Sequence, residues 1–162
     1  MVNRELICPQ SIVVVGGSNN VHKPGGRLVR NLLDGKYKGS LYVVNAKETD
    51  VQGLKSYHSV QDIPETEMAI LSIPSKACVE VVDVLAHQKN VKAFIIISAG
   101  FGEETKEGGQ LEDQILHTIN DVGASLIGPN CIGLMNIHFH GVFTQPIPDF
   151  HPDGVDFISS SG

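Results

Sequence analysis

The sequence predicts an α/β fold with a doubly wound, mainly parallel sheet that carries helices on both faces. Short apolar runs rich in β-branched residues recur at fairly even spacing, and few polar residues interrupt them. Such runs are typical of strands that are buried on both faces of a parallel sheet. Stretches with helical spacing of apolar residues lie between them, so strand and helix alternate as they do in right-handed crossovers.

The strands are expected at residues 12–15, 41–44, 68–73, 93–97 and 125–127. Helical apolar stripes run over residues 28–33, 78–85 and 111–122. Gly35 and Gly123 follow the first and third stripes, at positions where a glycine commonly ends a helix.

Two shorter features complete the expected helices. Residues 59–63 predict a single helical turn before Pro64. Glu103 and Glu104 are expected to begin the helix that leads to Leu111, because acidic side chains favour the positive end of a helix dipole.

The pattern changes after residue 135, which is the expected end of the first domain (1–135). Residues 136–152 are rich in His, Phe, Gly and Pro and have no helical period, so residues 136–153 are interpreted as a wrapping loop or linker. Residues 154–162 contain VDFISSSG, a strand that runs into a Ser/Gly turn. This segment is typical of the start of a further α/β domain.

Composition limits the function classes. The chain has 162 residues, 41% of them apolar, which is enough for the core of one domain. A net charge of −6 disfavours a nucleic-acid surface, so local groups must hold any bound anion. The sequence shows neither a signal peptide nor an apolar run of transmembrane length, and a cytoplasmic protein without a membrane partner is expected.

The metal-ligating residue types are scattered. Cys8, Cys78 and Cys131 are far apart and show no ligand spacing, so neither a disulfide framework nor a metal site is predicted. His138 and His140 form an H-x-H pair, but no third ligand is near in sequence, and a loop-packing role is favoured. Cys131 follows a Gly-Pro-Asn turn, where either a lowered thiol pKa or a small buried residue that shapes the turn is conceivable, and the second interpretation is preferred.

The loop after the first strand has the composition of an anion-binding turn. Gly16 and Gly17 allow close approach of a ligand to the backbone, and the following helix start offers free N–H groups. The alternative is a tight turn with no ligand. The next glycine pair begins eight residues after Gly17, so the loop departs from G-x-G-x-x-G, and the glycine that lets the helix pack closely is missing from its usual place. This spacing makes a hydride-transfer function a less favoured interpretation.

The loop after the second strand discriminates between ligands. A site for NAD usually places Asp or Glu there, whereas this chain has Asn45-Ala46-Lys47, with Glu48 only afterwards. A lysine favours a ribose that carries a phosphate, as in NADP or coenzyme A (CoA) with its 3′-phosphate. The alternative is a solvated surface lysine.

Six segments, in order along the chain, resemble one family. They are SIVVVGGSNN, GSLYVVNAK, LSIPSK, IIISAGFGE, LIGPNCIGLMN and VDFISSSG. Together they resemble the CoA-binding domain of NDP-forming acyl-CoA synthetases, which has a Rossmann-like fold. The family includes succinyl-CoA synthetase α subunits and the α portion of ADP-forming acetate–CoA ligase. This chain departs from the family at Ala46, where proline is common, at Ser75, where alanine is frequent, and at Ser160, where Gln or Arg is usual.

The resemblance implies a set of ligand contacts. The residues that it assigns to CoA are Gly16, Gly17, Ser18, Asn19, Asn20, Lys47, Pro74, Ser98, Ala99, Gly100, Gly128, Pro129, Asn130 and Cys131. The first loop would hold the pyrophosphate region, Lys47 would face the 3′-phosphate, and the turn at Gly128 would border the thiol and an acyl phosphate. The implied phosphate-site candidates are Asn130, Ser159, Ser161 and Gly162.

The resemblance also implies a reaction and partners. The family converts acyl-CoA, phosphate and ADP to acid, CoA and ATP through an acyl phosphate and a phosphohistidine. The catalytic histidine of the family would lie outside this chain, as would the ATP-grasp β subunit or fused domain that binds ADP/ATP and Mg. The chain is therefore expected to bind CoA or acyl-CoA without turnover. It is also expected to join an oligomer in the full enzyme. A stand-alone CoA- or NADP-binding regulatory module is the alternative. Half of an NADP-dependent oxidoreductase is less favoured, because the glycine spacing is wrong and no acid/base pattern is visible.

Overall fold

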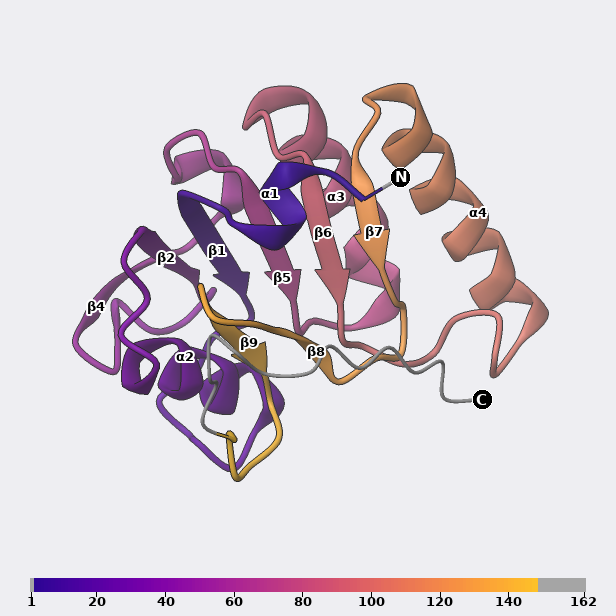
Figure 1. The fold of residues 1–162 in the computed structure, drawn as a ribbon. Coiled ribbons are helices and arrows are strands. Elements are labelled where there is room, and N and C mark those ends of the chain that lie inside the picture. The colour runs from indigo at the N-terminus through magenta and orange to yellow at the C-terminus, as the bar shows by residue number, and fades with distance from the viewer. Residues whose placement is uncertain (1, 149–162) are drawn as a thin grey trace.

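The computed structural model describes residues 2–148 and has one main sheet of seven strands (Figure 1). The strand order is β3-β4-β2-β1-β5-β6-β7. The strands are β1 (Ser11–Val15), β2 (Ser40–Val44), β3 (Asp50–Val51), β4 (Leu54–Tyr57), β5 (Met68–Leu71), β6 (Ala93–Ile96) and β7 (Ser125–Ile127). All neighbouring pairs are parallel except β3 and β4, which form an antiparallel hairpin.

Helices cover both faces of this sheet. One face carries α3 (Ser75–Gln88) and α4 (Lys106–Asp121), with the 3₁₀ turn η1 (Val60–Asp62) beside α3. The other face carries α1 (Arg4–Ile7), α2 (Pro24–Asp34) and a two-stranded hairpin of β8 (Gly133–Met135) and β9 (His140–Val142), which lies against α2 (Figure 1). The predicted doubly wound α/β fold is therefore confirmed.

The central strand shows why a continuous apolar run was the right signal. Ile12 and Val14 of β1 pack toward α2, whereas Val13 and Val15 pack toward α3. All four side chains are at most 4% exposed. Because helices cover both faces, neither face of this strand can tolerate the polar alternation of a half-exposed sheet.

The predicted start of α4 was wrong. The helix begins at Lys106, and the side chain of Thr105 caps it by accepting a hydrogen bond from the N–H of Gly108 at 2.9 Å. Glu103 lies before the helix, and its carboxylate accepts hydrogen bonds from the N–H groups of Gly100 and Phe101 at 2.8 and 3.1 Å. A threonine satisfies a free N–H of the first turn directly, which makes it the better N-cap.

Several short elements were not predicted, namely α1, the hairpin of β3 and β4, strand β8, and strand β9 within the segment that was interpreted as a wrapping loop. In that segment Phe139 is only 1% exposed and belongs to the core cluster with Leu28 and Ile70. The expected strand at residues 154–162 lies outside the described residues, as do Ser159, Ser161 and Gly162.

The buried position of Phe139 predicts a large stability effect. We expect Phe139→Ala to lower the free energy of unfolding by about 3–5 kcal/mol, because the change removes a buried ring and leaves a cavity. Ile137→Ala is the control, because Ile137 is 67% exposed and its truncation should change stability by less than about 0.5 kcal/mol. Urea denaturation followed by circular dichroism measures both, and equal effects would contradict a core role for this segment.

Candidate functional site

The order of the strands places a crevice between β1 and β5. The chain leaves β1 toward α2 on one face and leaves β5 toward α3 on the other, so the two loops diverge at the carboxyl ends of these strands. In Figure 1 these ends point to the bottom of the view. Without β3 the strand order corresponds to 3-2-1-4-5-6, and ligands of such sheets bind where the order reverses.

Close backbone contacts shape the glycine loop, residues 16–26. Gly16 has a φ of 87°, and a Cβ at this position would lie 2.3 Å from the carbonyl oxygen of Ser72. A Cβ on Gly25, in the first turn of α2, would lie 2.0 Å from the carbonyl oxygen of Gly16. Gly25 therefore allows the helix to pack closely on the end of β1. The close-packing glycine that is absent from its usual place in G-x-G-x-x-G is thus supplied by Gly25, later in a longer loop.

The N-terminus of α2 is open at this crevice. Its N-cap residue, Lys23, makes no side-chain capping hydrogen bond, and Pro24 occupies the first turn. Within residues 2–148, the N–H groups of Gly25 and Gly26 have no acceptor. Free N–H groups and the positive end of the helix dipole together favour an anion.

The polar side chains of the glycine loop serve different purposes. Ser18 Oγ accepts a hydrogen bond from the N–H of Asn20 at 3.1 Å, and Asn20 Oδ1 accepts one from the N–H of His22 at 3.0 Å. The side-chain amide of Asn19 donates to the carboxylate of Glu48 and, at 2.9 Å, to the carbonyl oxygen of Asp50. The donor hydrogens of Asn19 are thus used inside the protein, next to the hairpin of β3 and β4.

A cavity of about 450 Å³ lies beside the glycine loop, at the ends of β1, β2 and β4 and against α3. Its walls are largely aliphatic. Of the residues that the sequence assigned to the ligand, Gly16, Lys47 and Pro74 line it. Lys47 is exposed, and within the part of the chain that the structure describes no carboxylate pairs with it. The cavity therefore combines an apolar slot with an unpaired cation.

Sequence reasoning missed several residues of this cavity. The missed lining residues are Val15, Val44, Asn45, Ala46, His58, Ser59, Val60, Gln61, Ile73, Ala77, Glu80, Val81 and Val84. His58 follows β4 directly, and β4 was not predicted. The one available signal was the Gln52-Gly53 pair between Val51 and Leu54, a two-residue turn between short apolar positions.

The remaining predicted residues lie at the ends of β6 and β7, and the structure brings their loops together. The N–H of Asn130 donates to the carbonyl oxygen of Ser98 at 3.0 Å, and Ser98 Oγ donates to the carbonyl oxygen of Ile73 in the loop after β5. A Cβ on Gly100 would lie 3.1 Å from Ser75 Oγ. The loops therefore adjoin the crevice, although the residues that they contribute do not line the 450 Å³ cavity. These residues are Ser98, Ala99, Gly100, Gly128, Pro129, Asn130 and Cys131.

Comparison with known proteins identifies the family. A family model described as "CoA binding domain" matches residues 10–137. The chain belongs to this family of CoA-binding domains. The resemblance that the loop motifs carried is therefore confirmed.

The relatives of this CoA-binding domain are longer proteins. It is 39% identical over 156 residues to the ADP-forming acetate–CoA ligase II subunit alpha of Pyrococcus furiosus, covering 95% of this chain and 33% of that one. It is 39% identical over 134 residues to ADP-forming acetate–CoA ligase II of Archaeoglobus fulgidus, covering 82% and 20%. A solved dinucleotide-forming acetyl-coenzyme A synthetase 1 of Ca. Korarchaeum cryptofilum is 31% identical, with a TM-score of 0.78 over 86% of this chain and 30% of that one. The chain spans a third or less of the length of each.

Two thiols of the CoA-binding domain, those of Cys78 and Cys131, have raised pKa values. Burial raises the pKa of Cys131, whose Sγ donates to the carbonyl oxygen of Ile96 at 3.3 Å. The interpretation of Cys131 as a thiol of lowered pKa was therefore wrong, and the preferred turn-shaping role is favoured. Burial raises the pKa of Cys78 to about 11, although a hydrogen bond with Ser98 acts in the opposite direction. Neither thiol is therefore suited to act as a thiolate at neutral pH.

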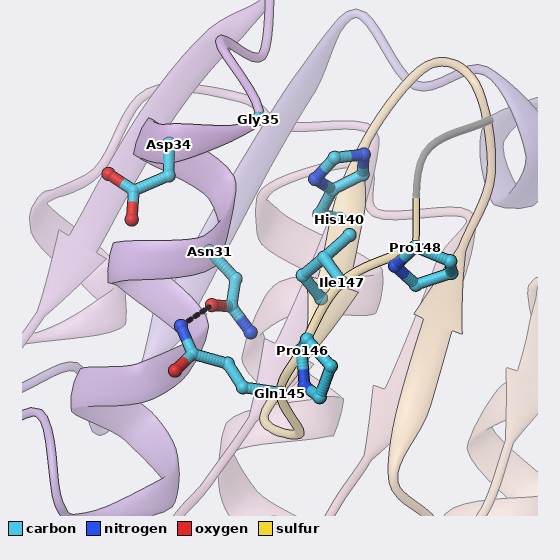
Figure 2. Close-up of a pocket in the computed structure, with 8 residues that line it drawn as sticks. All are labelled: Asn31, Asp34, Gly35, His140, Gln145, Pro146, Ile147 and Pro148. Carbon is cyan, nitrogen blue, oxygen red and sulfur yellow. Dashed lines mark hydrogen bonds between the residues drawn. The ribbon is translucent and has the colours of Figure 1, made fainter.

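A second cavity, of about 650 Å³, lies at the other end of α2 (Figure 2). It is lined by Asn31, Asp34, Gly35, His140, Gln145, Pro146, Ile147 and Pro148. Gln145 Nε2 donates to Asn31 Oδ1 at 3.2 Å, and the ring of His140 lies against Gly35. His140 therefore packs at the end of α2, about 16 Å along the helix from the open N-terminus.

Two kinds of feature are absent from residues 2–148. No group of three His, Cys, Asp or Glu side chains is placed to hold a metal ion. Within the same residues, no helix has the length and apolar character needed to cross a membrane.

The raised pKa of Cys78 predicts slow alkylation. At pH 8 iodoacetamide should leave Cys78 unmodified in the folded chain, because the thiol is buried and almost fully protonated below its pKa of about 11. Labelling should rise as the pH approaches that value. Peptide mass spectrometry after brief alkylation measures this, with the chain in guanidinium chloride as the control. Equal labelling of the folded and unfolded chains at pH 8 would contradict the burial of this thiol.

Proposed function

We propose that the chain is the CoA-binding portion of an ADP-forming acyl-CoA synthetase. The observation that carries the proposal is the crevice at the ends of β1 and β5, where the uncapped N-terminus of α2 adjoins an apolar cavity with Lys47 at its edge. Two phosphate-binding features next to a slot for a flat base match the chemistry of a 3′-phosphorylated adenosine diphosphate. Two relatives that match most of this chain are ADP-forming acetate–CoA ligases, which supports the same reaction class.

In this proposal CoA lies across the carboxyl edge of the sheet. The adenosine occupies the cavity, the 3′-phosphate pairs with Lys47, and the pyrophosphate faces the free N–H groups of Gly25 and Gly26. The pantetheine arm passes Pro74 and the loop from Ser98 to Gly100. Its thiol ends beside the turn of Gly128 to Cys131, where Asn130 is a candidate contact for phosphate.

The chemistry beyond binding belongs to other domains. The proposed full reaction converts acyl-CoA, phosphate and ADP to acid, CoA and ATP through an acyl phosphate and a phosphohistidine. ADP/ATP and Mg would bind to an ATP-grasp β subunit or fused domain. Within this chain, the contribution is to orient the thioester and to stabilise phosphate charge with backbone N–H groups.

The role of Lys47 predicts a ligand-specific loss of affinity. We expect Lys47→Ala to weaken CoA binding about 10- to 100-fold, because one charge-assisted contact to a phosphate is removed. Binding of 3′-dephospho-CoA should change by less than about twofold, since that ligand lacks the phosphate that Lys47 pairs with. Isothermal titration calorimetry of both ligands measures the difference.

Lys38→Ala is the matched control, because Lys38 is an exposed lysine just before β2. It lies at the amino ends of the parallel strands, whereas the cavity lies at their carboxyl ends. It should leave the affinities for both ligands unchanged. Tighter binding of NAD or NADP than of CoA by the unaltered chain would favour a different nucleotide-binding function, including the alternative of a stand-alone regulatory module.

The proposed division of labour predicts that the 162-residue chain does not catalyse the full reaction. Acetyl-CoA, ADP, phosphate and Mg should give no ATP above background in a luciferase assay, although the same preparation binds CoA. Formation of ATP at a rate proportional to the concentration of this chain would show that the catalytic groups lie within it.

A further inference from the structure

The hairpin of β3 and β4 holds the glycine loop in place through a set of directed hydrogen bonds. Gln52 lies in the turn of this hairpin, and its Nε2 donates to the carbonyl oxygens of Ser18 at 2.9 Å and of Gly26 at 2.8 Å. The backbone N–H of Gln52 also donates to Asn19 Oδ1 at 2.7 Å. One side chain at the edge of the sheet thus joins the middle of the glycine loop to the first turn of α2.

The local structure does not call for glutamine at this position. Gln52 and Gly53 connect β3 and β4 as a two-residue turn, with φ values of 54° and 85°. Turns with positive φ at both residues prefer Asn-Gly, because asparagine tolerates this backbone best. Asparagine is one methylene shorter, so the longer side chain serves its reach toward Ser18 and Gly26 rather than the turn.

The same side chain leaves a buried group unpaired. Gln52 Oε1 is buried and has no hydrogen-bond partner among the described residues. Rotating the amide by half a turn would put this oxygen against the two carbonyl oxygens, so the contacts hold it in place. A buried acceptor without a partner destabilises the folded state, so stability alone does not explain this residue.

We propose that Gln52, together with Asn19, is a positioning residue for the diphosphate of CoA. The inference rests on the proposed function. Because Gln52 occupies the carbonyl oxygens of Ser18 and Gly26, these oxygens are kept away from a bound anion, and the free N–H groups of the same segment remain to face it. Asn19 connects the loop to the hairpin through Asp50 instead of contacting the ligand.

The test uses Gln52→Asn in the 162-residue chain, because this variant keeps the turn but cannot reach the loop. CoA affinity should fall about tenfold, whereas the affinity for adenosine 3′-monophosphate, which lacks the diphosphate, should stay within about twofold. The melting temperature should not fall, since Asn-Gly suits the turn. Hydrogen exchange at the N–H of Asn19, which donates to Glu48 at 3.3 Å, should become faster without ligand.

Gln88→Asn is the matched control, because Gln88 is exposed at the end of α3 and far from the loop in the sequence. Unchanged CoA affinity in Gln52→Asn would overturn the proposal. Equal loss for CoA and adenosine 3′-monophosphate would also overturn it, because that result indicates general damage to the site. If the unaltered chain did not bind CoA at all, the proposed function itself would fail, and the positioning role would fail with it.

Discussion

The structure depends on a backbone contact in which no side chain fits. At the end of β1, the carbonyl oxygen of Gly16 meets the first turn of α2 at Gly25, while Gly16 itself sits against the carbonyl oxygen of Ser72 after β5. Three elements converge on one point only because two of these residues lack a Cβ. This convergence sets the height of the α2 N-terminus above the sheet, and it thereby places free N–H groups beside the cavity that Lys47 lines.

Amide side chains then organise the loops around that point. Asn45 Nδ2 donates to the carbonyl oxygen of Gly17 at 2.7 Å, and Asn45 Oδ1 accepts hydrogen bonds from the N–H groups of Lys47 and Glu48 at 2.8 and 3.1 Å. Asn45 thus lies at the end of the second strand, where many nucleotide sites place a carboxylate. It orders two loops rather than presenting negative charge, and a phosphate can approach without repulsion.

The parts of the fold that the sequence predicted are the strands that consist largely of apolar residues. Five of the six parallel strands, β1, β2, β5, β6 and β7, are largely apolar runs, so composition alone marked them. The hairpin of β3 and β4 has few buried positions, and its strands are held largely by hydrogen bonds that no periodicity reveals. Gly16 and Lys47 follow predicted strands, so their place at the cavity could be expected from the sequence, whereas that of His58, which follows β4, could not. The start of α4 was misplaced because Glu103 accepts hydrogen bonds from the N–H groups of Gly100 and Phe101 before the helix, whereas Thr105 caps the first turn at Gly108.

The two edges of the described sheet have a consequence for association. One edge is β3, with two residues, and the other is β7, with three. Strands this short present few free N–H and carbonyl groups to an incoming strand, which protects the chain from edge-to-edge aggregation. Helix faces and the loops at the carboxyl edge offer more contact area than either sheet edge. Any larger assembly is therefore expected to form through those surfaces, without the addition of strands from another chain to the sheet.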